Sequence, residues 1–134
     1  RQTFLGVWVR LIVEGQPFEV WEGQQLRDFT YVDDAVDALV LAAVEPRAAG
    51  RVFNVGGDAT ISLLKLAELL VELNGGGEFV QKSFPEDRKR IDVGDYYADD
   101  RLIRSVLGWA PHVSLREGLA RTLSYYREHL ARYV

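Results

Sequence analysis

Two groups of cationic side chains in this sequence have the chemistry to bind an anion. Arg27 stands alone between an extended stretch and a predicted helix, and Arg88, Lys89 and Arg90 form a cationic run in a chain with a formal net charge of −4. Guanidinium groups suit phosphate because their parallel N–H donors match two phosphate oxygens. The pattern therefore favours a diphosphate held between two cationic loops.

Aromatic and amide side chains near these cations extend the candidate site. Pro17 bends the chain before a short extended run that contains Phe18 and Trp21, and these rings can form a planar slot for a base. Asn54 ends a second predicted strand, just before two glycines. Together these residue types favour a nucleotide as the ligand.

Each signal also has a purely structural explanation. Arg27 can pair with Asp28 or Asp33 at the surface. The cationic run at 88–90 can be a solvated turn, Asn54 can simply form a turn before the glycines, and the aromatic rings can belong to the core. No single motif decides between these interpretations.

Composition excludes several functional classes. Sixteen Lys and Arg against twenty Asp and Glu argue against a nucleic-acid-binding protein. No cysteine is available for a disulfide or a thiolate metal site, and two histidines far apart in the sequence do not suggest zinc. No apolar run approaches the ~20 residues of a membrane span and no signal peptide is visible, so we predict a cytoplasmic protein.

The elements that must position these residues alternate helices with short strands. We predict an α/β fold, helix-rich with a few short strands, as a single domain over residues 1–134. The apolar periodicity predicts helices over 4–14, 32–45, 63–74, 100–107 and 115–130, and strands over 18–21, 51–55 and 78–84. The helix over 32–45 is expected to be sandwiched between layers, because one face is apolar and the opposite side is mostly alanine; the apolar face is formed by Val36, Leu39, Val40 and Ala43.

The motifs of a redox catalyst are missing from this sequence. No glycines have the G-x-G-x-x-G spacing of a dinucleotide-binding motif, and no tyrosine is followed four residues later by lysine. We therefore predict neither catalytic nor cofactor-binding residues in this stretch. The chain begins at Arg1 and contains no methionine, so we expect either a processed start or a piece of a longer protein.

An ordered set of motifs resembles the extended short-chain dehydrogenases, the NAD-dependent sugar-nucleotide epimerases, dehydratases and decarboxylases. RDFTYVDD at 27–34 resembles the signature R-D-[FWY]-x-[YH]-V-x-D, and VFNVGG at 52–57 resembles the strand [VI]-[FY]-N-[IV]-G-[GS] of that family. Further family segments are matched by residues 1–2, 15–21, 97–99, 107–111 and 114–119.

The resemblance implies that two domains of a longer enzyme have different roles. A Rossmann domain upstream would hold NAD and the catalytic tyrosine and lysine, and this C-terminal domain would bind a UDP- or dTDP-linked sugar, as in UDP-glucose 4-epimerase-like members. Arg27 would hold a phosphate, and Asn54 would lie near the nucleotide or its ribose. Pro17, Val20 and Trp21 would flank the base, partly through backbone groups.

The resemblance also implies a second clamp on the ribose and phosphate. Counting back from residues 97–99 places its basic and acidic members at Lys89 and Asp92. Because the basic residue is usually arginine in the family, Arg88 or Arg90 can fill the role after a shift of one position.

Two other functions remain open at this point. The chain can be a stand-alone nucleotide-sugar-binding module without catalysis. It can also be an assembly domain that associates with itself through an exposed first helix, which is rich in large apolar residues.

Overall fold

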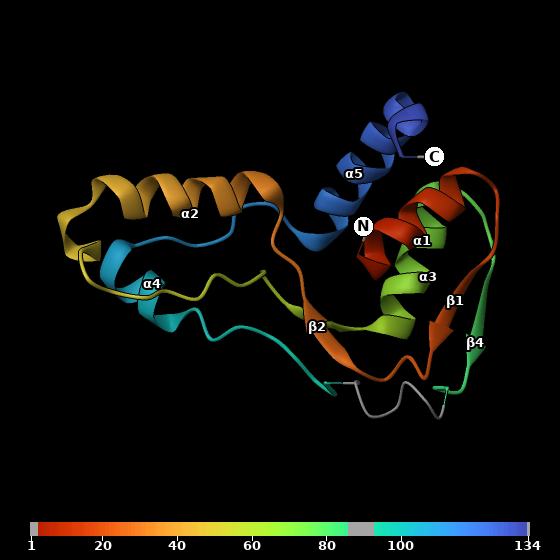
Figure 1. Cartoon of the computed structure of the whole chain (residues 1–134), viewed down its shortest axis with the longest axis horizontal. Coiled ribbons are helices and arrows are strands. Elements are labelled where there is room, and N and C mark those ends of the chain that lie inside the picture. The colour runs from red at the N-terminus through yellow and green to blue at the C-terminus, as the bar shows by residue number, and fades with distance from the viewer. Residues whose placement is uncertain (1–2, 86–92, 134) are drawn as a thin grey trace.

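The computed structural model describes residues 3–85 and 93–133. The chain is elongated, with its helices in two groups (Figure 1), and each group encloses a hydrophobic cluster. The larger cluster is formed by α1 (Phe4–Val13), β1 (Phe18–Trp21), α3 (Leu63–Asn74), β4 (Phe79–Lys82) and α5 (Leu115–His129). The smaller cluster is formed by α2 (Val32–Val44), the 3-10 helix η1 (Pro46–Ala48) and α4 (Arg101–Leu107).

Local sequence signals explain the helices of the larger cluster. The hydroxyl of Ser62 accepts a hydrogen bond from the Lys65 backbone N–H at 3.3 Å and caps α3. Gly75 ends that helix in the left-handed region, with φ of 76°, which glycine adopts without steric penalty. Leu66 and Leu70 on its inner face are fully buried, and the helix predicted over 63–74 is confirmed.

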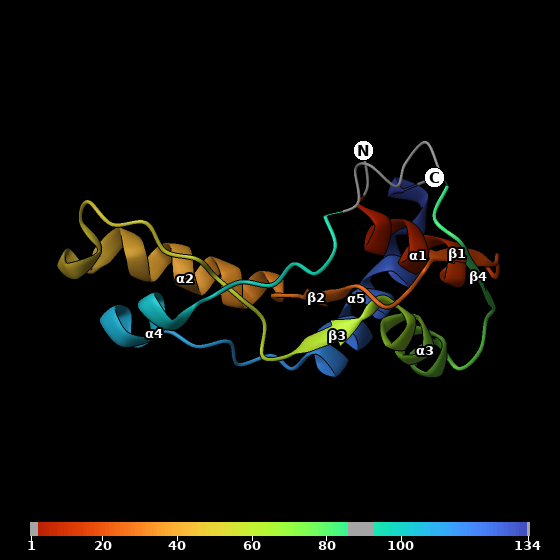
Figure 2. The same ribbon diagram turned by 90° about the horizontal axis from the view of Figure 1, so that it is seen from below.

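Two small sheets connect these elements. β1 runs parallel to β4, with Phe18 opposite Phe79. β2 (Leu26–Asp28) pairs antiparallel with β3 (Thr60–Ser62), and Figure 2 shows this pair between the two groups of helices. Tyr96 adds an isolated parallel bridge to Arg27, so a third segment lies beside β2.

A buried carboxylate organises the smaller cluster. Asp34 is 2% exposed, and its two carboxylate oxygens accept hydrogen bonds from the backbone N–H groups of His112, at 2.9 Å, and Val113, at 3.0 Å. The backbone oxygen of Asp34 accepts a third bond from the indole N–H of buried Trp109 at 3.1 Å. These bonds tie the start of α2 to the segment that leads into α5.

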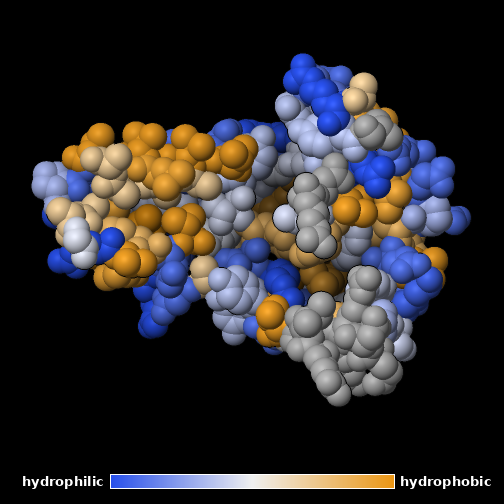
Figure 3. Space-filling view, viewed as in Figure 1, coloured by the Kyte–Doolittle hydropathy of each residue, from blue (hydrophilic) through white to orange (hydrophobic). Residues whose placement is uncertain are grey.

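The predicted environment of α2 is wrong. Its predicted apolar face is exposed, with Leu39 at 71% and Val40 at 56%, and its fully buried residues are Asp34 and Ala38. The reason is that α4 and η1 cover only the Ala38 side of the helix. Figure 3 shows the remaining apolar surface over α2.

The strand predicted over 51–55 is also wrong. Every residue of this segment is described, and none of them belongs to a strand. Val52 is 86% exposed, and residues that favour the extended conformation cannot make a strand without a neighbour to pair with. The sequence interpretation also missed β2 and β3, whereas the five predicted helices and the strands at β1 and β4 are confirmed within a few residues.

Within the described part of the chain, none of the helices has both the length and the apolarity needed to cross a membrane.

Candidate functional site

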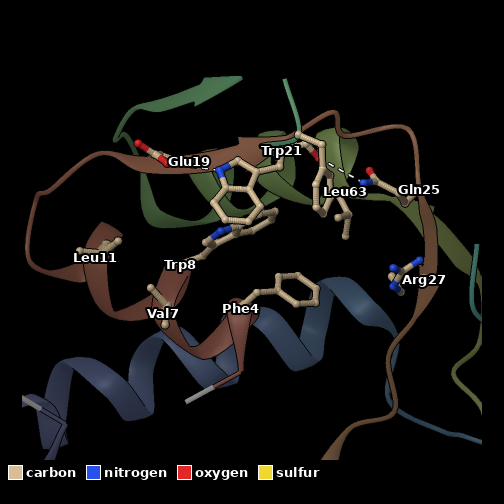
Figure 4. Close-up of a pocket in the computed structure, with 10 residues that line it drawn as sticks. Phe4, Val7, Trp8, Leu11, Glu19, Trp21, Gln25, Arg27 and Leu63 are labelled. Carbon is tan, nitrogen blue, oxygen red and sulfur yellow. Dashed lines mark hydrogen bonds between the residues drawn. The ribbon is translucent and has the colours of Figure 1, made fainter. Parts of the chain in front are cut away.

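A pocket of about 470 Å³ lies between α1 and β1 (Figure 4). Most of its lining is aromatic or aliphatic: Phe4, Val7, Trp8, Leu11, Trp21, Leu63 and Phe84. Three polar side chains complete the lining, namely Glu19, Gln25 and Arg27. A largely apolar cavity with a few placed polar groups is the common form of a small-molecule site.

The alternation of β1 decides which of its residues reach the pocket. Phe18 and Val20 point into the core, where they are 1% and 0% exposed, while Glu19 and Trp21 line the pocket. Of the two rings expected to form a slot, only Trp21 is therefore available. A role for Val20 is limited to its backbone, because its side chain is buried.

Gln25 fixes the turn that follows β1. Its side-chain oxygen accepts a hydrogen bond from the Gly23 backbone N–H at 3.0 Å, and its amide donates to the Trp21 backbone oxygen at 3.3 Å. Because Gln25 is only 8% exposed, these bonds are shielded from water and hold Trp21 in place.

Arg27 contributes a guanidinium group to the pocket from β2. Its Nη1 donates to the backbone oxygens of Leu26, at 2.7 Å, and of Gly94. The segment containing Gly94 is fixed to β2 by two further bonds, from the Tyr96 N–H to Leu26 and from the Leu26 N–H to the Asp95 carboxylate. Two neighbouring carbonyls thus orient the Arg27 side chain.

The predicted second clamp at Arg88, Lys89, Arg90 and Asp92 lies outside the described residues. Of the described residues that flank it, Phe84 lines the pocket, whereas Gly94 contacts the pocket residue Arg27 without lining the pocket itself. On one side Phe84 lines the pocket and packs edge-on against Trp21, with the ring centroids 5.4 Å apart. On the other side Gly94 accepts the hydrogen bond from Arg27.

Asp28, next to Arg27, connects three segments behind the pocket. Its Oδ2 accepts hydrogen bonds from the backbone N–H groups of Gly57, at 3.1 Å, and Ala98, at 3.2 Å. A Cβ at Gly57 would lie only 2.3 Å from the backbone oxygen of Phe29. The second glycine of the pair is therefore required by close backbone packing.

Asn54 and Pro17 lie away from the pocket lining. The Asn54 amide donates to the backbone oxygen of Asp99 at 3.4 Å, on an open hollow lined by residues 97–101. There the hydrogen bonds from the Arg101 guanidinium lower the pKa of Asp99 to about 2. Pro17 is exposed and precedes β1 without lining the pocket. The structure therefore does not bring Asn54 together with Arg27.

Glu19 is a pocket residue that the sequence interpretation missed. Its carboxylate accepts hydrogen bonds from the Lys82 ammonium and, at 3.2 Å, from the Trp21 indole N–H. The bond from Lys82, followed by that from Trp21, lowers the pKa of Glu19, so the group is ionised at neutral pH. The strand period predicts that Glu19 shares a face with Trp21, and this signal was available from the sequence.

The described residues contain no group of three or more His, Cys, Asp or Glu side chains that could hold a metal ion. The geometry instead combines a largely aromatic wall, a guanidinium group and a carboxylate. Such a pocket suits an elongated ligand with an aromatic part and an anionic part.

Comparisons with known proteins identify relatives of this sequence. Residues 2–56 match the profile of the NAD dependent epimerase/dehydratase family. The chain is 36% identical to dTDP-glucose 4,6-dehydratase from Streptomyces griseus over 123 residues. This aligned region covers 91% of this chain and 37% of the relative.

Solved structures share the fold. A UDP-glucose 4-epimerase from Thermotoga maritima, solved with UDP-glucose, is 32% identical with a TM-score of 0.84, over 96% of this chain and 40% of its own. MoeE5, solved in complex with UDP-glucose and NAD, is 34% identical with a TM-score of 0.83, over 96% of this chain and 42% of its own. The chain thus spans about two fifths of the length of these relatives.

Proposed function

Since this chain belongs to the NAD-dependent epimerase/dehydratase family, we propose that its pocket binds the nucleotide diphosphate of a sugar substrate for such an enzyme. The bound part would be the non-reacting nucleotide. Its binding energy would orient the sugar toward catalytic groups held elsewhere. The chain itself would then provide affinity and position without a catalytic residue.

The observation that supports this proposal is the sharing of one pocket by Arg27 and Trp21. A guanidinium group can bind the diphosphate while an aromatic wall covers the base, and the two needs are met within one cavity of about 470 Å³. The solved relatives that bind UDP-glucose support the same class of ligand. A UDP-glucose 4-epimerase-like activity of the whole protein remains our proposal.

NAD would be held by the part of a full-length relative that this chain does not span. When bound, NAD would accept a hydride from the sugar and later return it. The exposed apolar face of α2 supports a contact with such a cofactor-binding domain, because Leu39 and Val44 are each 71% exposed. The first helix, by contrast, buries Trp8, Val9 and Ile12 within this chain.

Calorimetric titration of the chain with UDP, uridine and NAD tests the proposed ligand class. We expect UDP to bind at least about tenfold more tightly than uridine, because only UDP offers charged oxygens to the guanidinium group. NAD should bind more weakly than UDP. Equal affinities for UDP and uridine, or tighter binding of NAD than of UDP, would contradict the proposal.

A further inference from the structure

The end of α3 carries a residue pair that is prone to spontaneous chemical change, an asparagine followed by a glycine. Asn74 is the last residue of the helix, and Gly75 begins the turn after it. At such a pair the backbone nitrogen of the glycine can attack Cγ of the asparagine side chain, because the glycine has no Cβ to block the approach. Asn74 does not line the pocket between α1 and β1, so this chemistry is separate from the proposed binding of a nucleotide.

The reaction needs only water and hydroxide. The Gly75 backbone nitrogen loses its proton to hydroxide and forms a bond to Cγ of Asn74. The bond from Cγ to Nδ2 breaks, and the nitrogen leaves as ammonia after taking a proton from water. Water then opens the succinimide ring at one of its two carbonyl carbons. The product is aspartate or isoaspartate, which adds one negative charge, and no atom is oxidised or reduced.

Hydrogen bonds restrain each group that takes part in the first step. The Gly75 N–H, whose nitrogen must attack, donates to the backbone oxygen of Glu72 at 3.0 Å. The leaving nitrogen of Asn74 donates to the backbone oxygen of Gly76 at 2.9 Å. Oδ1 of Asn74 accepts a hydrogen bond from Nη2 of Arg127 at 2.8 Å. Ring closure therefore requires the end of α3 to open.

The bond from Arg127 differs from the other two because it comes from another helix, α5. The same Nη2 also donates to the backbone oxygen of Asn74 at 3.4 Å, so Arg127 ties the end of α3 to α5 through two oxygens of one residue. Helix ends open locally far more often than a whole chain unfolds, and a contact present only in the closed form lowers the population of the open form. We propose that Asn74 is a deamidation site and that Arg127 slows the reaction there.

Incubation of the chain in mildly alkaline buffer, followed by proteolysis and mass spectrometry, measures the reaction as a gain of one mass unit in the peptide that contains residue 74. The other asparagine, Asn54, is an internal standard, because the β-branched Val55 after it hinders attack. We expect Asn74 to deamidate while Asn54 keeps its amide over the same time. Asn74→Gln should remove the gain, because glutamine would have to form a larger ring.

Arg127→Ala should raise the rate at Asn74 about fivefold, the factor that corresponds to one hydrogen bond lost from the closed form. Arg116→Ala is the matched control, because Arg116 also joins α5 to α3, through the Glu72 carboxylate at 2.9 Å. Loss of this exposed pair should leave the rate within about twofold of that of the wild type. Thermal unfolding should show that both variants are folded at the temperature of incubation.

Each arm of the experiment has a result that contradicts the proposal. Deamidation of Asn54 as fast as that of Asn74 in the wild type would overturn the site. Equal rates in Arg127→Ala and Arg116→Ala would overturn the role of Arg127. A slower rate in Arg127→Ala would overturn it as well, because the guanidinium group would then be polarising the Cγ carbonyl for attack. Arg127→Lys keeps one donor and the charge, so its rate should lie between those of the wild type and Arg127→Ala.

Discussion

Replacing Arg27 by alanine is expected to weaken the binding of UDP by about 10- to 100-fold. A hydrogen bond to a charged group contributes roughly 1.5–3 kcal/mol, and the guanidinium group is proposed to bind the diphosphate directly. The affinity of Arg27→Lys for UDP should fall between those of the wild type and Arg27→Ala, because an ammonium group keeps the charge but loses the parallel donors. Calorimetry with UDP measures the effect.

The control for this experiment is Arg47→Ala. Arg47 is exposed on η1, where it pairs with Glu45 at 3.0 Å, and it does not line the pocket. Arg27 also donates to the backbone oxygens of Leu26 and Gly94, so thermal unfolding must show that its variants remain folded. A folded Arg27→Ala chain that binds UDP as tightly as Arg47→Ala would exclude Arg27 from the site.

Replacing Asp34 by alanine is expected to lower the free energy of unfolding by about 3 kcal/mol. The change removes the acceptor of two backbone N–H groups, those of His112 and Val113, and leaves both without a protein partner in a part-buried region. Asp34→Asn should be less destabilising, because one acceptor oxygen remains. Urea unfolding followed by tryptophan fluorescence measures the difference.

Asp33 provides a comparison at the neighbouring position. Its side chain is 67% exposed and lies 3.6 Å from Arg121, so Asp33→Ala should change the free energy of unfolding by less than about 1 kcal/mol. If the two alanine variants unfold at the same urea concentration, Asp34 does not organise the smaller cluster in solution.

The helices could be predicted because their signals are local. Apolar residues at helical spacing and capping residues such as Ser62 and Ser114 identify a helix without knowledge of its neighbours. What covers a helix is not a local property. Val36, Leu39 and Val40 indicate an apolar face of α2, but nothing in their spacing says that this chain leaves the face exposed.

The strands show the same limit. β2 and β3 are three residues each, too short for an alternating pattern, and their pairing joins positions about 34 residues apart, such as Arg27 and Ile61. The segment 51–55 has the pattern of a strand but no partner within the described residues. A strand depends on its neighbours for its hydrogen bonds, and this information is not local.

The candidate site was predicted in part. Arg27 and Trp21 share a pocket, as the sequence interpretation requires, but Asn54 lies beside Asp99 instead. Phe84 and Glu19 were missed for different reasons. Phe84 reaches the pocket only through the pairing of β1 with β4, whereas Glu19 could have been found by counting two residues back from Trp21 along the strand.

The central claim is that one pocket between α1 and β1 holds a nucleotide diphosphate between Trp21 and Arg27. Titration of the nitrogen-15-labelled chain with UDP, followed through the indole N–H signals of its three tryptophans, tests it most directly. The signal of Trp21 should move with saturation, while that of Trp109, buried in the smaller cluster, should stay in place. Movement of the Trp109 signal with no change at Trp21 would place the ligand elsewhere and contradict the account.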